Sequence, residues 1–287
     1  KAPRWPLGIS EDDVTPCRPE EWQTVLNVRE RGEPAEIEIP ETHHALALGT
    51  LRASFTTLKG YLFCPVSAYI DRVWKPPYFA EGTGEGRMNA IRAGDIFHAA
   101  ALRYHGSNPD GLPDSLFERF DSQSVRQGVK DRWNRFLESP CAQWTGVTAE
   151  RRIRLRYQTA NGPVTFNGFI DAMIEEPEGW RLVDYKTGHL DGKSIADYSL
   201  QLCLYRKALT AEGLSVKNEA WLAHIEPESF SLIPVSLDEH EPRLDQLIED
   251  FAAMFARKTM PPSAEDAPCE YCRHRQICPR RRDGAIS

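Results

Sequence analysis

Two aspartates and a lysine in the segment GFIDAMIEEPEGWRLVDYKTG could together carry out chemistry on a phosphodiester. Alternate side chains of a strand share one face, so Asp184 and Lys186 are predicted to project together. Asp171 lies on the preceding strand, and a hairpin turning at 177–179 would bring it near Asp184. Two carboxylates can hold a divalent cation that polarises a phosphoryl oxygen and activates water. A lysine beside them can position or deprotonate that water, or stabilise negative charge in the transition state.

Three cysteines near the C-terminus form a second group that could bind a metal. Cys269 and Cys272 enclose two residues and Cys278 follows closely, a spacing that lets thiolates wrap an ion or a cluster. The chain has 7 cysteines, an odd number without a secretory signal, which fits poorly with a disulfide framework. A zinc site completed by His274 is one alternative, although His274 is only two residues from Cys272. An iron–sulfur cluster with a fourth cysteine is the other.

The composition indicates a folded protein and leaves the partner open. Hydrophobic residues make up 41% of the chain and charged residues 27%, which is enough for a buried core. The net charge of −7 argues weakly against nucleic acid. Local basic segments count for more, and there are two: Arg151, Arg152, Arg154 and Arg156, then Arg273, Arg275, Arg280, Arg281 and Arg282. No apolar run is long enough to span a bilayer, so we expect a cytoplasmic protein without a membrane partner.

Hydrophobic periodicity predicts an α/β arrangement with a mixed central sheet flanked by helices. Residues 1–50 resemble an extension or linker with a helix at 20–30 and an extended stretch at 35–39, and residues 51–287 form the main domain. Helical spacing runs through 52–74, with a break at Pro65. The other expected helices are 91–104, 116–137, 195–211 and 242–257. The expected strands are 152–157, 164–175, 180–184, 219–225 and 231–235.

The motif G-x-I-D, a turn, and then D-Y-K-T-G resembles the core of the RecB-like nucleases within the PD-(D/E)XK superfamily. The resemblance covers about residues 52–280 and implies a restriction-endonuclease-like core. It implies binding of Mg²⁺ or Mn²⁺ by Asp171 and Asp184, catalysis by Lys186, and a further ligand in the backbone carbonyl of Tyr185.

Two satellite motifs of the family are also present. Gln201 and Tyr205 match a Gln-x-x-x-Tyr helix, where they would share one face and contact DNA or hold the active site. Gly94 and His98 match a G-x-x-x-H setting, which makes His98 a candidate third side-chain ligand. Glu150 resembles an acidic position of the family.

The cysteine spacing is similar to that of a subset of RecB-like nucleases, which includes the CRISPR-associated members and the AddB nuclease domain. In these, one cysteine before the nuclease core and three after it bind a 4Fe–4S cluster that staples the N- and C-terminal segments together. The resemblance assigns this role to Cys64, Cys269, Cys272 and Cys278.

These resemblances together predict a metal-dependent deoxyribonuclease, an exonuclease or end-trimming enzyme acting on single-stranded DNA or duplex ends. The expected context is DNA repair, recombination or CRISPR adaptation. The sequence contains no Walker-type phosphate loop, so ATP-driven movement would come from a helicase or another subunit. The alternative is a non-catalytic DNA-binding or scaffolding module of a helicase–nuclease complex. Intact Asp171, Asp184 and Lys186 disfavour that alternative.

Overall fold

The computed structural model describes residues 51–74, 85–107, 123–256, 260–263, 267, 269–275, 277 and 278. The expected extension, residues 1–50, lies outside the described residues together with the elements predicted in it. The chain divides into two compact units. The sheet unit comprises Leu48–Lys59 and Pro77–Ala253, and the cysteine unit comprises Lys1–Ala47, Gly60–Pro76 and Met254–Ser287.

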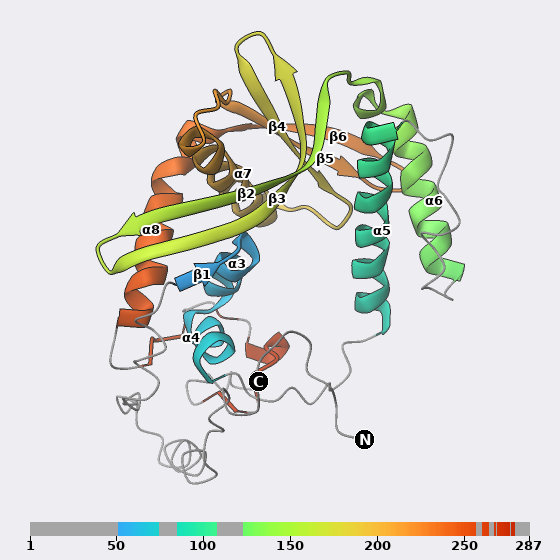
Figure 1. Ribbon diagram of the computed structural model, residues 1–287. Helices are drawn as coiled ribbons and strands as arrows, with labels where there is room; N and C mark the ends of the chain where they lie inside the picture. The colour runs from blue at the N-terminus through green and yellow to red at the C-terminus, as the bar shows by residue number, and fades with distance from the viewer. Residues whose placement is uncertain are drawn as a thin grey trace, which may run out of the picture. The chain divides into compact units, whose positions relative to one another are not determined.

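The sheet unit is built on a mixed sheet of six strands, as Figure 1 shows. The strands are β1 (Leu51–Ala53), β2 (Val147–Thr159), β3 (Gly162–Glu176), β4 (Gly179–Lys186), β5 (Glu219–Ile225) and β6 (Phe230–Ser236). The order is β1-β3-β4-β5-β6, with β2 also paired to β3. The pairs β1–β3 and β4–β5 are parallel and the others are antiparallel. The predicted mixed sheet flanked by helices is confirmed and is consistent with a restriction-endonuclease-like core.

Two tight turns set the register of β2, β3 and β4. Gly162 and Gly179 follow these turns with φ of 106° and 126°, a region of backbone space that glycine occupies without strain. The resulting hairpins pair Thr159 with Gly162 and Glu176 with Gly179. A meander with turns this short places residues near in sequence directly opposite one another.

The helices come at the positions that periodicity indicates, with shifted ends. The expected helical start at residue 52 was wrong, because Leu51–Ala53 form strand β1, which pairs with β3, and the helix begins at Phe55. The helices are α3 (Phe55–Phe63), α4 (Pro65–Tyr69), α5 (Glu85–Ser107), α6 (Gln123–Glu138), α7 (Gly192–Ala211) and α8 (Leu237–Ala256), with the π-helix η2 (Ile70–Trp74) and the 3₁₀ helices η4 (Pro140–Gln143) and η5 (Cys269–Tyr271). The start predicted for the last helix, at Pro242, was wrong. Helix α8 begins at Leu237, directly after β6, and Pro242 lies inside it.

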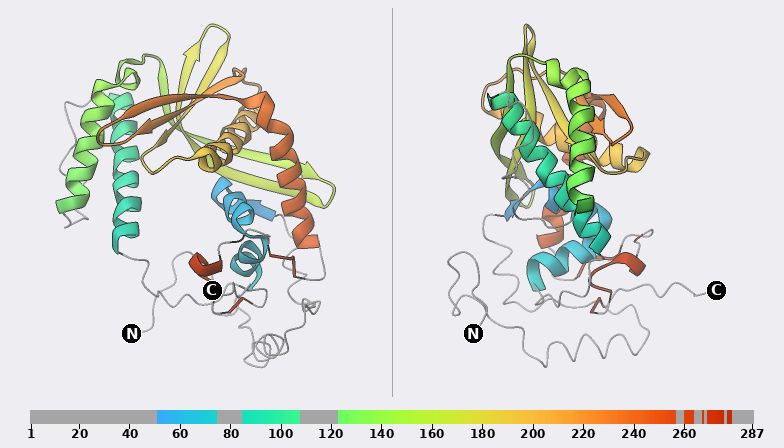
Figure 2. Two further views of the ribbon diagram at one scale, coloured as in Figure 1. Left: turned by 180° about the vertical axis from the view of Figure 1, so that it is seen from behind. Right: turned by 90° about the vertical axis from the view of Figure 1, so that its right-hand side faces the viewer.

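Helices α5 and α6 cover one face of the sheet, and both views show them side by side (Figures 1 and 2). Phe97 of α5 and Phe136 of α6 are fully buried against β4, where Tyr185 meets both rings edge-on. Burying each such side chain contributes about 1.5–3 kcal/mol. Side chains alternate along β4, so the two neighbours of Tyr185, Asp184 and Lys186, point to the opposite face of the sheet. There Lys186 contacts α7.

The described residues of the cysteine unit include the end of α3, the short helices α4 and η2, the end of α8 and the 3₁₀ helix η5. Cys64 is extended, with φ of −167° and ψ of 122°, between the end of α3 and Pro65 at the start of α4. The predicted break at Pro65 is therefore confirmed. Across the described part of the chain, no helix has the length and apolar character needed to cross a membrane.

Candidate active site

The two aspartates of the central motif lie where β3 and β4 separate. The last register pair before the separation is Ala172 with Val183, and Asp171 and Asp184 are each one residue beyond it. The side chain of Asp171 reaches across the gap, and its Oδ2 accepts a hydrogen bond of 2.9 Å from the backbone N–H of Tyr185. The hairpin therefore brings the two carboxylates together, as the sequence predicts.

Asp184 is buried, with 1% of its surface exposed. Its Oδ2 forms an ion pair with Nζ of Lys186 at 2.5 Å. Burial raises the pKa of Asp184 to about 6, and the charge of Asp171 adds to the rise against the opposing effect of Lys186. A buried carboxylate is costly unless it is paired with a cation, and Lys186 supplies that cation here.

Asp171 pairs with His98 of α5, whose Nδ1 lies 3.3 Å from its Oδ2. Burial would raise the pKa of Asp171, but His98, Lys186 and the N–H of Tyr185 together bring it below its ordinary value. The pKa of His98 is raised in turn, because Asp171 outweighs the effect of burial. The predicted ligand His98 is thus at the site, engaged with one of its carboxylates.

Lys186 is held by an anion, an amide and a ring. Its Nζ lies 2.5 Å from Asp184, 3.5 Å from Oε1 of Gln201 and 4.0 Å from the centre of the Tyr198 ring. Burial would lower the pKa of Lys186, but Asp184 and Asp171 raise it above its ordinary value. A protonated ammonium in this position can stabilise negative charge that develops nearby.

The Gln-x-x-x-Tyr pair lies on the face of α7 that meets the site. Gln201 accepts from Lys186 and donates 2.5 Å to the hydroxyl of Tyr205, so it links the two side chains. Tyr205 is only 4% exposed, and its ring would lie 3.5 Å from a Cβ added at Gly168. Of the two roles expected for this pair, the geometry supports holding the active site.

Sequence reasoning missed Tyr198, whose ring contacts Nζ of both Lys186 and Lys59. It precedes Gln201 by three residues, so helical spacing from the motif could have found it. The role of Gly94 was also missed. A Cβ added there would lie 3.2 Å from Oγ1 of Thr187, so the glycine lets α5 approach the residue after Lys186.

Glu150 occupies β2 between Ala149 and Arg151, whose register partners flank Asp171. It is exposed, and among the described residues it makes no hydrogen bond or ion pair. Its φ of 50° is uncommon for a residue with a side chain and costs about 1 kcal/mol. The register places Glu150 across from Asp171 on the neighbouring strand, with its side chain exposed.

Within the described residues, no three His, Cys, Asp or Glu side chains are grouped so as to hold a metal ion. The two aspartates are not grouped around an ion, because His98 and Lys186 contact their carboxylate oxygens. Carboxylate oxygens and an imidazole are nevertheless suitable donors for Mg²⁺ or Mn²⁺. The carboxylates of Asp171 and Asp184 with the imidazole of His98 provide a donor set of this kind.

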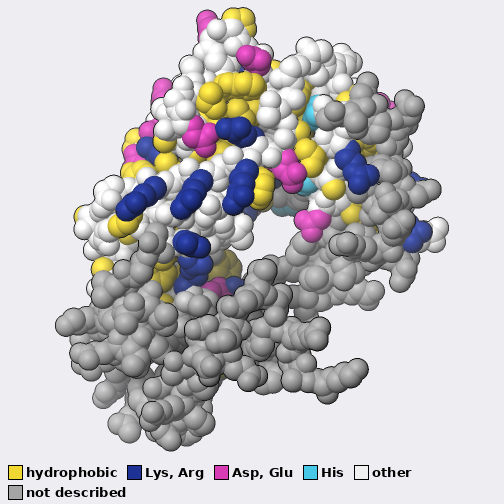
Figure 3. Space-filling model, viewed as in Figure 1, with side chains coloured by type: hydrophobic (Ala, Val, Ile, Leu, Met, Phe, Trp, Pro, Cys, Tyr) yellow, Lys and Arg dark blue, Asp and Glu magenta, His cyan; other side chains and the backbone are white. Residues whose placement is uncertain are grey.

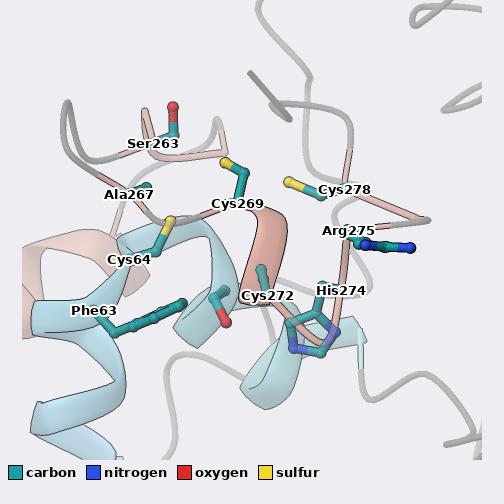
Figure 4. Close-up of a pocket in the computed structure, with 10 residues that line it drawn as sticks. Phe63, Cys64, Ser263, Ala267, Cys269, Cys272, His274, Arg275 and Cys278 are labelled. Carbon is teal, nitrogen blue, oxygen red and sulfur yellow. The ribbon is translucent and has the colours of Figure 1, made fainter. Parts of the chain in front are cut away.

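The four motif cysteines line one pocket of the cysteine unit, which Figure 4 shows: Cys64, Cys269, Cys272 and Cys278. Within the described residues none of the four is in a disulfide. Burial raises the pKa of Cys272, and charges on Cys64 and Cys269 would raise it further, which reflects their proximity. The chain wraps the pocket through turns, as the N–H of Cys272 donates to Cys269 and that of Cys278 donates to His274.

His274 also lines the pocket, but its ring is already engaged. It is 1% exposed, and its Nε2 lies 2.9 Å from Oδ1 of Asp71, which also pairs with Arg273. This contact joins the C-terminal loop to the turn after α4. It weakens the alternative in which His274 completes a zinc site.

The sequence model of the PD-(D/E)XK nuclease superfamily matches residues 52–279. This span contains both aspartates, Lys186 and all four pocket cysteines. The chain belongs to the PD-(D/E)XK nuclease superfamily, whose members are mostly nucleases.

A comparison with curated proteins finds none that matches the chain. Among solved structures, similarity extends to one titled "Crystal structure of SSO0001", with 15% identity over 70% of this chain and 98% of the other. The TM-score is 0.39, too low for the likeness to define the fold or the function.

Proposed function

We propose that this chain is a Mg²⁺- or Mn²⁺-dependent deoxyribonuclease of the RecB-like type. The observation that carries the proposal is the meeting of Asp171, Asp184 and Lys186 where β3 and β4 separate, with His98 beside Asp171. The side chains of Asp171, Asp184 and His98 and the carbonyl of Tyr185 would hold the ion. When bound, such an ion polarises the phosphoryl group and lowers the pKa of water.

The remaining residues have separate tasks. Lys186, kept protonated by its two acidic neighbours, would stabilise negative charge as the phosphodiester is attacked. Gln201, Tyr205 and Tyr198 would hold that ammonium in place from α7.

Cleavage of end-labelled single-stranded and duplex DNA tests this proposal. With Mn²⁺ we expect shortening of the label-bearing strand and complete loss of it in EDTA. Asp184→Asn and Lys186→Met should each reduce the rate on the order of 10²-fold or more, whereas the exposed changes Asp250→Asn and Lys130→Ala should leave it unchanged. Intact DNA under all metal conditions would refute the proposal, provided circular dichroism shows a folded protein.

A second candidate, a non-catalytic DNA-binding or scaffolding module, draws on the same geometry. In the described residues both aspartates are engaged by basic side chains rather than grouped for an ion. DNA binding without cleavage in Mg²⁺ and Mn²⁺ would favour that role, in a complex with a helicase or another subunit.

We further propose that Cys64, Cys269, Cys272 and Cys278 hold a 4Fe–4S cluster. Four cysteines line one pocket, and segments from both ends of the superfamily match contribute them, which supports this assignment. Thiolate ligation suits iron–sulfur clusters. The cluster would join the segment around Cys64 to the C-terminal loop, as in the RecB-like nucleases that carry one.

Metal analysis after anaerobic purification tests the cluster. We expect about four iron and four sulfide per chain, lost in Cys64→Ser and retained in Cys203→Ser, which changes a buried cysteine of the sheet unit. Stoichiometric zinc in a colourless protein would instead support the zinc alternative.

The preferred activity within this proposal is exonucleolytic or end-trimming, in DNA repair, recombination or CRISPR adaptation. Comparing linear with closed circular single-stranded DNA separates this from endonuclease action. Cutting of the circle would contradict it.

A further inference from the structure

The outer edge of the β2–β3 ribbon carries three arginines in a row. Arg152, Arg154 and Arg156 alternate along β2 with the buried Ile153 and Leu155, so all three project from the exposed face. Figure 3 shows Lys and Arg side chains lined up along this ribbon. Successive members of the row are two strand residues apart, about 6.6–6.8 Å.

Among the described residues these three arginines make no ion pair or hydrogen bond, unlike other basic residues of the sheet. Arg151 pairs with Glu212, and Arg181 with Glu176 and Glu219. Lys217 also pairs with Glu176. The row is thus an uncompensated positive strip in a chain of net charge −7. Exposed charges without partners contribute little to folding, so stability does not explain them.

The residues opposite the row complete a surface suited to nucleic acid. On β3, Arg152 faces Phe169, Arg154 faces Asn167 and Arg156 faces Thr165. Phe169 is 53% exposed, one of few large apolar side chains of the described chain left so open. Beyond Thr165, Arg52 of β1 extends the positive strip. An aromatic ring beside a positive groove is the combination on which single strands bind, because unpaired bases can stack on the ring.

The strand that faces the arginine row, β3, continues from Phe169 to the active site. Phe169 is followed two residues later on β3 by Asp171, about 7 Å further along the strand. We propose that the exposed face of the β2–β3 ribbon is a track for single-stranded DNA. Phosphates lie along Arg156, Arg154 and Arg152, a base stacks on Phe169, and the next nucleotide reaches Asp171 and Asp184. This inference rests on the proposed nuclease function and adds the strand type and the path of the substrate.

Binding in the absence of metal tests the track separately from cleavage. The affinity of fluorescein-labelled oligo-dT for the full chain is measured by anisotropy in EDTA over a range of salt concentrations. The variant Arg152→Gln, Arg154→Gln, Arg156→Gln should weaken binding about 10- to 100-fold and reduce the salt slope by about 2, since each lost phosphate contact on a single strand removes about 0.7. A matched control, Arg126→Gln, Lys130→Gln, Arg135→Gln on α6, removes the same charge and should bind as the wild type does.

The aromatic part of the track has its own readout. Phe169→Ala should weaken binding about 5- to 150-fold with an unchanged salt slope, because stacking of one base is lost without loss of a phosphate contact. Phe169→Tyr keeps the ring and should retain the affinity. Since Phe169 is more than half exposed, neither change should lower the unfolding temperature.

The outcomes separate the track from the nuclease proposal. Wild-type protein that binds no oligo-dT in EDTA, or binds duplex more tightly than single strands, overturns the track. So does an arginine variant that binds like the α6 control. If the arginine and Phe169 variants lose binding but no protein cleaves DNA in Mn²⁺, the track stands and the nuclease proposal fails.

Discussion

Replacing Lys186 with methionine should destabilise the metal-free protein by an amount that depends steeply on pH. Asp184 is buried and has Lys186 as its nearest cation, 2.5 Å away. Even with this partner, its pKa is about 6 rather than the ordinary 3.8, chiefly because of burial. Methionine keeps the length of the side chain and removes its charge, so the pKa of Asp184 should rise further.

The magnitude follows from linkage between protonation and folding. In the wild type, Asp184 has a raised pKa, so the free energy of unfolding is highest below pH 3.8. It falls as pH rises to 6 and is then constant. The loss is about 3 kcal/mol at 1.36 kcal/mol per pKa unit. In Lys186→Met the carboxyl stays protonated beyond pH 6, so the loss continues. Relative to wild type the variant should be about equal at pH 5, about 1 kcal/mol less stable at pH 7 and about 3 kcal/mol less stable at pH 8.

Urea unfolding in EDTA between pH 5 and 8, followed by circular dichroism, measures these differences. The double variant Asp184→Asn, Lys186→Met removes both groups and should show no such pH dependence. A difference between Lys186→Met and wild type that is constant from pH 5 to 8 would refute the reasoning, because it would mean that Asp184 does not titrate in this window.

Three further predictions concern residues around the site. His105, whose Nε2 lies 2.8 Å from the hydroxyl of Tyr185, has its pKa lowered by burial to about 4. The stability of the wild type should therefore fall as pH drops from 6.5 to 4. Thermal unfolding should show this loss in the wild type and not in His105→Gln. Gly94→Ala places a Cβ 3.2 Å from Oγ1 of Thr187. Alanine is favoured over glycine in a helix by about 1 kcal/mol, but this close contact should cancel the gain. Urea unfolding should therefore show the stabilisation only in the double variant Gly94→Ala, Thr187→Ala. Gly179→Ala combines φ of 126° with a Cβ 2.7 Å from the carbonyl oxygen of Ser215 and should cost more than Gly162→Ala, which has strain alone, about 1–3 kcal/mol. Equal unfolding midpoints for these two glycine variants would contradict the packing argument.

The central motif was predictable because its geometry is local. A short turn and the alternation of a strand suffice to place Asp171, Asp184 and Lys186 together, and helical spacing suffices for Gln201 and Tyr205. The pairing of His98 with Asp171 depends on how α5 packs against the sheet, which periodicity does not specify. The same is true of Gly94, whose meaning comes from its distance to Thr187.

Other features lay beyond local reasoning. Pro242 suggests a helix start by its own preference, but α8 begins five residues earlier, against the end of β6. The arginines of β2 can be recognised in the sequence as a basic segment. Their separation into the paired Arg151 and the unpaired row depends on which strand face each occupies.

The contact between His274 and Asp71 closes a long loop within the cysteine unit. These residues are 203 positions apart in the chain, and closing a loop of that length costs about 5 kcal/mol in chain entropy. The buried His274 and its pairing with Asp71 therefore offset part of that cost. They hold the C-terminal loop against the segment that follows α4.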